Sequence, residues 1–499
     1  RKGPLSVSPA LAGETACLTH REKRGQKPVK ERKGMKKWKR LACAVLVPAL
    51  LTCLLPAGAF AENAADTWDG TADTSWYDAN DVKATYDITT AEQLAGLAEI
   101  ACNKNYSPQG KYEQFENTTF TLRADLDLAG HMWKAIAYPP GNGSSSKGFQ
   151  GTFDGNGHTI SNLSYSGNTS ECGLFYWLGN KSTVKNLGLL NADITATSVS
   201  GVHQLQTGIL AAASFGTILN CYTTGSLKVE GEYVSAGGLV GMLAAGGDGA
   251  AMTGCYSSAN ITGQFANAGD AVDYAALGGL IGTADTNIYG LSIKNCYFDG
   301  SITSNAENSI GGIVGAVFCN NVEKGVTLQN CLSAAQGSFS GAQAAQIGTL
   351  YEGGALQTVS GCFWNDSEVP GILLDGAPAG DAGAAMGTPV SDWTDEAQFG
   401  ALALGTEVDG VTWVMGIKHP TFAWDERNLP ADYTRVDAAI EQANALRAAD
   451  YTDFSAVTAA VNAVDRTKSK AQQAEVDAMA QAILEAIAAL EKKPAPAPA

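Results

Sequence analysis

Basic side chains are scarce in this sequence. Its 499 residues include 33 Lys and Arg against 50 Asp and Glu, which gives a formal net charge of −17 at pH 7. The first 61 residues hold 13 of the basic residues and only 3 of the acidic ones, so the remainder carries a net charge of −27. Nucleic acids and anionic lipids are bound by basic surfaces that release counterions. This charge therefore excludes nucleic acid as a partner.

Several patterns that carry chemistry are also missing. No two cysteines form a C-x-x-C pair, which argues against a zinc site, and no G-x-x-x-x-G-K phosphate loop occurs. The nearest match to a serine-hydrolase elbow, GSFSG at 337–341, has Phe339 where the nucleophile would stand. The histidines after residue 61 occur in unrelated contexts: His131, His158, His203 and His419.

The amino-terminal region has the composition of an export signal. The sequence MKKWKRLACAVLVPALLTCLLPAGAFA, residues 35–61, has a basic start, an apolar middle and a small-residue end. Its two prolines and its A-x-A end argue against a retained membrane anchor. We expect cleavage after Ala61, a secreted or bacterial cell-surface location, and no membrane insertion afterwards. Residues 1–34 precede a good start and are expected to be upstream translation and disordered.

A short phrase with a central cysteine recurs along the chain. It reads ILNCYTTGSL at 218–227 and IKNCYFDGSI at 293–302, and its five copies are centred on Cys221, Cys255, Cys296, Cys331 and Cys362. The separations of 34, 41, 35 and 31 residues indicate a solenoid. A second phrase, which reads GGLVG at 237–241, alternates with the first. The gap from this phrase to the next cysteine is nearly fixed, whereas the return gap varies as loops do.

These phrases predict a mainly β protein. Short β-rich stretches separated by glycines, without a helical period, are typical of strands. At this repeat length they predict a parallel β-helix with about three short strands per coil and coils roughly 4.8 Å apart. The cysteines are expected to fill one interior position in successive coils, which Leu187 fills in another. Beside them, a polar stack is expected at a bend: Asn186, Asn220, Asn295 and Asn330.

Two other roles for the cysteines remain open. Eight cysteines follow the export signal, so disulfides between neighbouring coils are one alternative. Parallel strands in register give poor dihedral geometry for such bonds. Metal binding is the other alternative, and the leucine at an equivalent position argues against it. We favour buried thiols that pack as small apolar groups.

Longer stretches resemble a known family. GTFDGNGHTISNL at 151–163, CGLFYWL at 172–178 and the alternation of the two phrases resemble the GLUG-motif proteins of bacterial surfaces. WDGTADTSWYD at 68–78 resembles the amino-terminal cap of that architecture, and VTWVMGIKHPTFAWD at 411–425 resembles its closing segment. The resemblance implies a β-helix with an amino-terminal cap over residues 62–426.

The carboxy-terminal region is expected to be a separate unit. Apolar residues at helical spacing predict three short helices that close into a small bundle. Residues 432–491 resemble FIVAR modules, which recur in extracellular, cell-wall-attached and sugar-acting bacterial proteins. Residues 427–431 are expected to be a linker. Residues 492–499 form a Pro-Ala linker that looks like the beginning of a stalk.

Carboxylates are the strongest candidates for catalysis. Parallel β-helices host polysaccharide lyases and hydrolases, which need paired carboxylates or a basic residue with bound Ca²⁺. The candidates are Asp125, Asp127 and Asp154, but in the resembled family these positions look structural. We expect no catalytic residue and no cofactor. The acidic stretch 66–82 fails the EF-hand spacing, although loose Ca²⁺ binding stays open.

Aromatic residues suggest a binding role. Tyr222, Tyr256 and Tyr297 each follow an inward cysteine, so they are expected to face outward in a column that Phe363 extends. The column is a candidate surface for sugar rings, or else it shields strand edges or packs under loops. We interpret the chain as a monomeric, non-catalytic binding or adhesion protein directed at an extracellular glycan or a host or cell-wall component. The alternatives are a polysaccharide lyase or hydrolase, and an inert stalk or accessory region of a larger surface enzyme.

Overall fold

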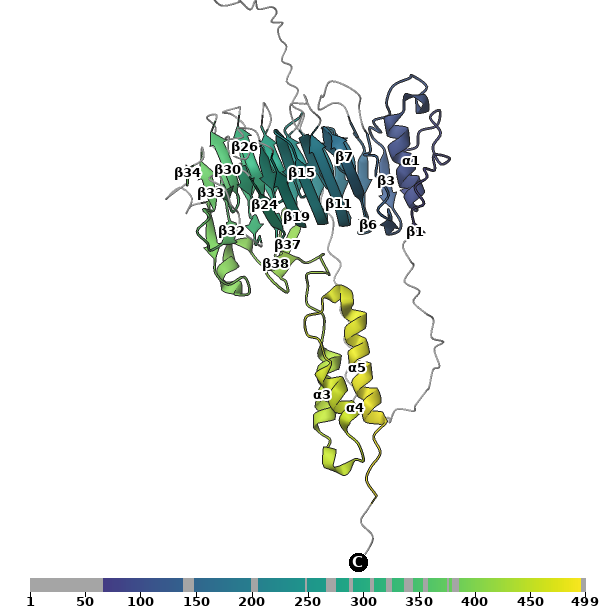
Figure 1. The fold of residues 1–499 in the computed structure, drawn as a ribbon, viewed down its shortest axis with the longest axis vertical. Helices are drawn as coiled ribbons and strands as arrows, with labels where there is room; N and C mark the ends of the chain where they lie inside the picture. The colour runs from purple at the N-terminus through teal and green to yellow at the C-terminus, as the bar shows by residue number, and fades with distance from the viewer. Residues whose placement is uncertain are drawn as a thin grey trace, which may run out of the picture. The chain divides into compact units, whose positions relative to one another are not determined.

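A parallel β-helix followed by a small helical module makes up the described part of the chain, which confirms the predicted fold class (Figure 1). A computed structural model describes residues 66–137, 148–198, 205–246, 249–265, 275–286, 290–305, 309–319, 325–335, 344–352, 358–374, 377–378 and 386–494. The predicted upstream residues, the signal peptide and the last five residues of the Pro-Ala linker lie outside these ranges. Within them, no helix is long and apolar enough to cross a membrane.

Each complete coil contains four strand segments, not the predicted three. One coil runs through β14 (Thr217–Leu219), β15 (Tyr222–Glu230), β16 (Val234–Gly237) and β17 (Val240–Ala244). The difference arises at the GGLVG phrase, which bends the chain between β16 and β17. A Cβ on Gly237 would lie 2.2 Å from the Val240 carbonyl oxygen, so a larger residue does not fit this corner.

The four segments of successive coils stack into four sheets. The first sheet contains β1 (Asp66–Thr67), β4 (Leu126–Asp127), β6 (Thr159–Ser161), β11 (Gly188–Ser198), β15, β19 (Tyr256–Gln264), β23 (Tyr297–Phe298), β28 (Leu332–Ser333), β32 (Cys362–Asn365) and β35 (Gly387–Val390), with β7 (Ser164–Thr169) beside β11 and β24 (Ser301–Ser304) beside β19. The second contains β2 (Thr85–Ile88), β3 (Thr119–Leu122), β5 (Thr152–Asp154), β10 (Thr183–Lys185), β14, β18 (Ala250–Thr253), β22 (Leu291–Lys294), β27 (Val326–Gln329) and β31 (Thr358–Ser360).

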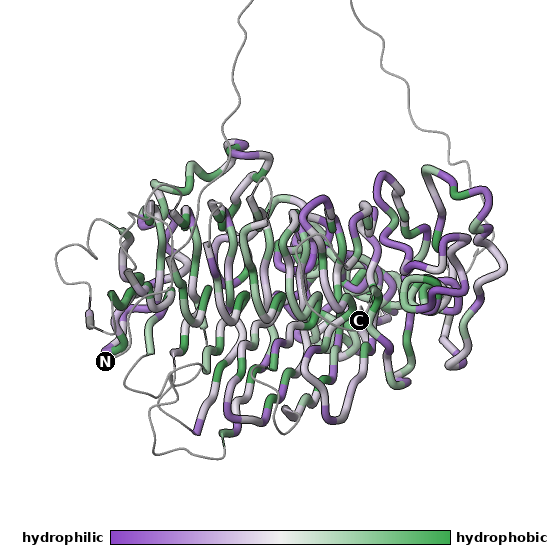
Figure 2. The backbone as a smooth tube through the Cα atoms, turned by 90° about the horizontal axis from the view of Figure 1, so that it is seen from above, coloured by the Kyte–Doolittle hydropathy of each residue, from purple (hydrophilic) through white to green (hydrophobic). Residues whose placement is uncertain are grey.

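The other two sheets lie on either side of the GG corner. The third contains β8 (Glu171–Cys172), β12 (Leu205–Gly208), β16, β20 (Ala276–Gly278), β25 (Ser309–Gly311) and β29 (Ala344–Ala345). The fourth contains β9 (Phe175–Leu178), β13 (Ala211–Ser214), β17, β21 (Ile281–Asp285), β26 (Val314–Cys319), β30 (Gly348–Glu352), β33 (Ile372–Leu374) and the antiparallel β34 (Ala377–Pro378). Several of these strands are buried at every residue, among them β9, β12, β13 and β16. Figure 2 shows hydrophobic and hydrophilic stretches recurring along the coils.

The repeated cysteines lie inside the β-helix. All five are at most 1% exposed, and each is a free thiol. Leu187 fills the same interior position one coil earlier. The strand register shows this, since Gly188, which follows Leu187, pairs with Tyr222, which follows Cys221. The Cys296 thiol donates to the Lys294 carbonyl oxygen at 3.1 Å, and burial raises the pKa of Cys296 well above its ordinary value. These thiols therefore act as small packing groups.

Asparagines occupy the bend between the second sheet and the first. Asn186, Asn220, Asn295 and Asn330 have φ between 50° and 54°, a left-handed conformation that asparagine tolerates better than most residues. The Asn330 amide donates to Asn295 Oδ1 at 3.2 Å, and the Asn220 amide donates to Asn186 Oδ1 at 3.4 Å. Gly254 takes this place in the coil between the two pairs, with φ of 66°. The asparagines therefore stack in pairs and do not form one continuous row.

The amino-terminal end of the β-helix carries the helix α1 (Ala91–Cys102), which lies beside the first coils (Figure 1). Thr90 caps this helix by accepting a hydrogen bond from the Gln93 backbone amide at 3.3 Å. Leu94, Leu97 and Ile100 are fully buried. The helix therefore contributes its apolar side to the interior that the coils share. A short helix, η1 (Lys104–Tyr106), follows it.

After the last coil the chain forms a covering segment, residues 390–428, which we call the strap. It contains η2 (Glu396–Leu402) and an antiparallel meander of β36 (Glu407–Val408), β37 (Val411–Met415) and β38 (Pro420–Phe422). The predicted helical bundle follows as α3 (Thr434–Asn444), η3 (Ala448–Asp450), α4 (Ser455–Asn462), η4 (Lys470–Gln472) and α5 (Gln473–Ala488). Its core is small: Ala431, Val436, Ala439, Ala443, Val457, Val476, Ala480 and Ile483.

Candidate functional site

The predicted aromatic column exists. Tyr222, Tyr256, Tyr297, Leu332 and Phe363 pair in register along the first sheet. The rings of Tyr222 and Tyr256 stack with centroids 5.1 Å apart, and those of Tyr256 and Tyr297 stack at 4.5 Å. The column lies outside the apolar interior of the coils and belongs to a hydrophobic cluster of its own.

The strap covers this column, so the expectation of an open binding surface is wrong and the alternative, that the aromatic residues pack under a later segment of the chain, holds. Tyr222 is 9% exposed, Phe363 2%, Tyr256 1% and Tyr297 0%. Phe399 packs against Phe363, and Trp413 and Phe422 pack against Tyr297. Stacked aromatic rings present a large apolar area, and here the chain itself buries it. These four residues belong to a second hydrophobic core beneath the strap.

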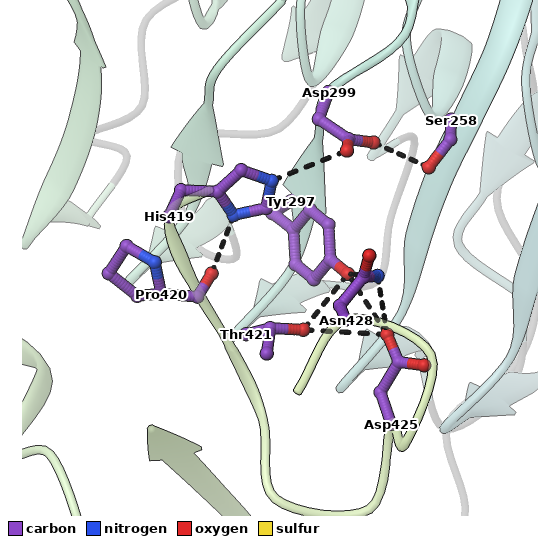
Figure 3. A network of polar contacts seen from close by, with 8 residues as sticks. All are labelled: Ser258, Tyr297, Asp299, His419, Pro420, Thr421, Asp425 and Asn428. Atoms are coloured by element: carbon purple, nitrogen blue, oxygen red, sulfur yellow. Dashed lines mark hydrogen bonds and ion pairs between the residues drawn. The ribbon is translucent and has the colours of Figure 1, made fainter. Parts of the chain in front are cut away.

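A buried polar network joins the strap to the column (Figure 3). The Tyr297 hydroxyl donates to Asp425 Oδ2 at 3.3 Å and accepts from the Asn428 amide at 3.0 Å. The same amide donates to Asp425 at 2.7 Å, and Thr421 also donates to this carboxylate. Asp425 is only 2% exposed, so its charge is balanced by these hydrogen bonds. The network fixes how the strap lies on the column.

A second part of the network brings together the side chains of a serine, an aspartate and a histidine (Figure 3). His419 Nε2 lies 3.3 Å from Asp299 Oδ2, and Nδ1 lies 2.8 Å from the Pro420 carbonyl oxygen. Ser258 donates to the other oxygen of Asp299 at 2.5 Å. Nucleophilic catalysis requires the serine to bond the histidine. Here both bond the aspartate, so the group is a buried clasp for the strap and not a catalytic triad.

The clasp predicts an acid-sensitive strap. Burial acts to raise the pKa of Asp299, but the hydrogen bond and charge of His419 outweigh it, and the pKa is lowered. A carboxyl with a lowered pKa stabilises the fold above its unfolded pKa of about 3.9, and this contribution is lost as pH falls through the folded value. We therefore expect tryptophan fluorescence to report strap release from about pH 4 downward.

The matched variant for this prediction is Asp299→Asn. It removes the charge that titrates, so its melting temperature should change less between pH 6 and pH 3 than that of the unmodified protein. Asp409→Asn is the control, because Asp409 forms an exposed ion pair with Lys294. An acid profile that Asp299→Asn and Asp409→Asn alter to the same extent would count against the clasp.

The strap leaves four corners of the β-helix uncovered. Asp125, Gly157, Asn186 and Asn220 stand at the bend between the second sheet and the first in four successive coils. We call these positions the corner row. Together with Tyr222 and strap residues 424–427, they line a cavity of about 620 Å³. This volume lies within the range of pockets that hold small ligands.

An aromatic wall closes one side of this cavity. The Trp424 ring stacks on Tyr222 with centroids 6.0 Å apart, and its buried Nε1 has no hydrogen-bond partner in the described structure. The Arg427 guanidinium lies 3.7 Å from the centre of the Tyr222 ring and donates to the Tyr256 hydroxyl at 2.6 Å. Its Nε lies 3.7 Å from Asp425. Arg427 is therefore engaged within the protein.

Hydrogen-bond acceptors remain available in the corner row. Asp125 Oδ1 accepts from the Thr159 backbone amide at 2.8 Å and lies 3.3 Å from His158 Nδ1, while no described residue bonds its Oδ2. The Asn220 amide nitrogen donates to Asn186, which leaves Asn220 Oδ1 without a donor among the described residues. Glu426 is exposed and pairs with Lys470 through one oxygen at 2.7 Å. The cavity thus offers carboxylate and amide oxygens beside an aromatic ring.

The other two carboxylates identified in the sequence, those of Asp127 and Asp154, stabilise turns of the backbone. Asp127 Oδ1 accepts from the Ala129 backbone amide at 2.8 Å and from the Asn162 side chain at 2.7 Å. Asp154 Oδ1 accepts from the Asn156 backbone amide at 2.9 Å and pairs with Lys185. Within the described ranges, no three His, Cys, Asp or Glu side chains come together as metal ligands. Loose Ca²⁺ binding remains a prediction.

Sequence reasoning identified part of this cavity. It named Tyr222 as a ligand-binding candidate, Asp125 as a catalytic candidate and Asn186 and Asn220 as structural residues, but not Trp424, Glu426 or Arg427. The available signal was the end of the closing segment, where TFAWDER at 421–427 places an aromatic residue beside three charged ones. Nothing in its spacing relates it to a residue about 300 positions earlier, since that contact depends on the return path of the strap.

Comparison with known proteins gives limited matches. No family model matches the chain. Over 183 residues, 35% of this chain, it is 30% identical to halomucin of Haloquadratum walsbyi, and the match spans only 2% of halomucin's length. The solved structure of a Bacteroides ovatus protein, provisionally described as an immunoglobulin A1 protease, aligns with a TM-score of 0.40 and 21% identity over 68% of this chain and 93% of that chain.

Proposed function

We propose that this protein is a non-catalytic glycan-binding protein of a bacterial cell surface, and that it binds through the cavity between the corner row and the strap. The observation that carries the proposal is the composition of that cavity. Sugars present apolar C–H faces that pack on aromatic rings and hydroxyl groups that donate to oxygen acceptors. Trp424 supplies the ring, while Asp125, Asn220 and Glu426 supply the acceptors.

Other features support a surface location. The export signal at 35–61, the resemblance of 62–426 to GLUG-motif surface proteins and that of 432–491 to FIVAR modules all point outside the cell. The local similarity to halomucin is consistent with this. In this proposal the protein acts as a monomer, needs no cofactor and contacts an extracellular glycan or a host or cell-wall component.

The competing proposal is a polysaccharide lyase or hydrolase. It is favoured by one observation, namely that Asp125 and Glu426 both line the cavity. A glycan-cleaving site needs two such groups in defined roles, one as acid and one as base or nucleophile. The binding proposal is preferred because Asp125 holds the Thr159 amide and Glu426 pairs with Lys470, so both have structural partners.

Trp424→Ala tests the proposal. We expect at least about a tenfold loss of affinity on a glycan array, equivalent to roughly 1.4 kcal/mol, because the variant removes the ring on which the sugar stacks. Trp393→Ala is the matched control, since Trp393 lies on the same strap but lines a different cavity. Circular dichroism would verify that both variants fold.

The same protein should release no reducing ends or unsaturated sugars from pectin, mucin, hyaluronan or wall glycans. Equal array binding by the two tryptophan variants would contradict the placement of the site. Turnover of any of these glycans that Asp125→Asn abolishes without loss of fold would favour the enzyme instead.

A further inference from the structure

The corner row runs along the β-helix axis, because each of its members comes from a different coil. Neighbouring coils are about 4.8 Å apart, which is close to the length of one hexose unit in an extended glycan chain. Asp125, Asn186 and Asn220 each place a polar side chain at this spacing, and Gly157 leaves room in the coil between Asp125 and Asn186. The row therefore matches a linear chain laid parallel to the axis, with one sugar unit at each coil.

The strap blocks the row at one end. In the coil after Asn220, a Cβ on Gly254 would lie 2.9 Å from Val411 of the strap. In the next coil Asn295 is 1% exposed and accepts a hydrogen bond from Trp413 at 3.2 Å. At the other end the Asp125 side chain is 60% exposed. A chain that follows the row thus meets Val411 and Trp413 of the strap as a barrier and can leave past the exposed Asp125.

The charges of the cavity disfavour an acidic ligand. Three carboxylates line it, those of Asp125, Asp425 and Glu426, against the single guanidinium of Arg427, and the neighbouring Lys470 is already paired with Glu426. That guanidinium already contacts Tyr222, Tyr256 and Asp425. A uronic or sialic acid would bring a further carboxylate into this field without an uncommitted cation to pair with it, and like charges at close range are repulsive.

We propose that the corner row binds the end of an extended, uncharged glycan chain that lies along the β-helix axis, with Val411 and Trp413 of the strap as the stop. This inference rests on the proposed glycan binding and adds the orientation of the chain, the need for a chain end and the exclusion of acidic sugars. A chain end is required because one end of the row is blocked. Acidic sugars are excluded because carboxylates line the cavity.

The test uses the full chain and defined oligosaccharides in a titration. Linear cello-, chito-, manno- and malto-oligosaccharides of two to six units are compared with the same chains carrying a bulky cap at the reducing or the non-reducing end. Affinity for the preferred series should rise with length and level off near four units, since four corners are uncovered. A cap at one end should weaken binding at least tenfold, and the cap at the other end should have little effect.

Cyclodextrins and oligogalacturonides complete the set, because the first have no chain end and the second are acidic. Both should bind much more weakly than the linear uncharged chains do. Tight binding of chains capped at either end, or of oligogalacturonides, would overturn this inference while leaving glycan binding intact. Failure of every oligosaccharide and of the glycan array would overturn the proposed function as well.

Asp125→Asn isolates the charge. The variant keeps an oxygen that can accept from the Thr159 amide but loses one carboxylate. The ratio of acidic to uncharged oligosaccharide affinity should rise about fivefold, the effect of removing one like charge at close range in water. Asp193→Asn is the control, since it changes the net charge equally at a residue that bonds Ser226 outside the cavity. An equal rise in both variants would refute selection by the cavity.

Discussion

A protein carrying Cys296→Arg should not form the β-helix. Cys296 is fully buried, and its thiol already lies within hydrogen-bonding distance of backbone carbonyl groups of its own and the preceding coil. An unpaired guanidinium in such a place costs several kcal/mol for its lost hydration, and the added volume strains the neighbouring coils. We expect circular dichroism to show no cooperative unfolding transition and size-exclusion chromatography to show aggregates.

Cys296→Ala is the control for this substitution. It removes one sulfur atom from the same position and should lower the free energy of unfolding by about 1 kcal/mol through a small cavity. If the arginine variant unfolded at the same temperature as the alanine variant, the interior position of the repeated cysteine would be wrong.

Trp413→Ala should release the strap while the coils stay folded. Trp413 is 1% exposed, packs against the tilted ring of Phe422 with centroids 4.5 Å apart and donates to Asn295 from its indole nitrogen. Truncation of a fully buried tryptophan costs about 3–5 kcal/mol. Limited proteolysis should therefore cut within residues 390–428, and the far-ultraviolet circular dichroism of the β-helix should be retained.

Ile417→Ala provides the comparison on the same strap. Ile417 is 38% exposed, so its truncation should change the free energy of unfolding by no more than about 0.5 kcal/mol. Equal protease sensitivity of the two variants would mean that the packing of Trp413 does not hold the strap in place.

The repeat was predictable because it is local. The spacing of the cysteine phrases gives the length of one coil. Leu187 shows that the interior position accepts any small or medium apolar side chain. The count of strand segments was not predictable from the same phrases. Two adjacent glycines are compatible with a flat strand or with a corner. The structure shows a corner, because backbone atoms approach Gly237 too closely for a larger residue.

The candidate site was much less predictable. The direction of the tyrosines follows from alternation along a strand, but their cover does not. Tyr297 bonds Thr421, which is 124 residues later, and Asn220 and Trp424 line one cavity from still more distant positions. No periodicity in the sequence encodes the return of the strap along the outside of the coils. The same aromatic spacing is therefore compatible with an open surface and with a buried one.

The route of the strap decides where a pulling force would enter the β-helix. The strap leaves the last coils, where Phe399 contacts Phe363, passes Tyr297 and reaches Tyr222 with Trp424. A force that pulls on the chain beyond residue 428 would act first on the contacts between the strap and the coil of Tyr222. The later coils would not yet bear this force. Those coils would feel the load only after the aromatic contacts had peeled away one after another. The strap would therefore detach from the β-helix in small steps before any coil unfolds.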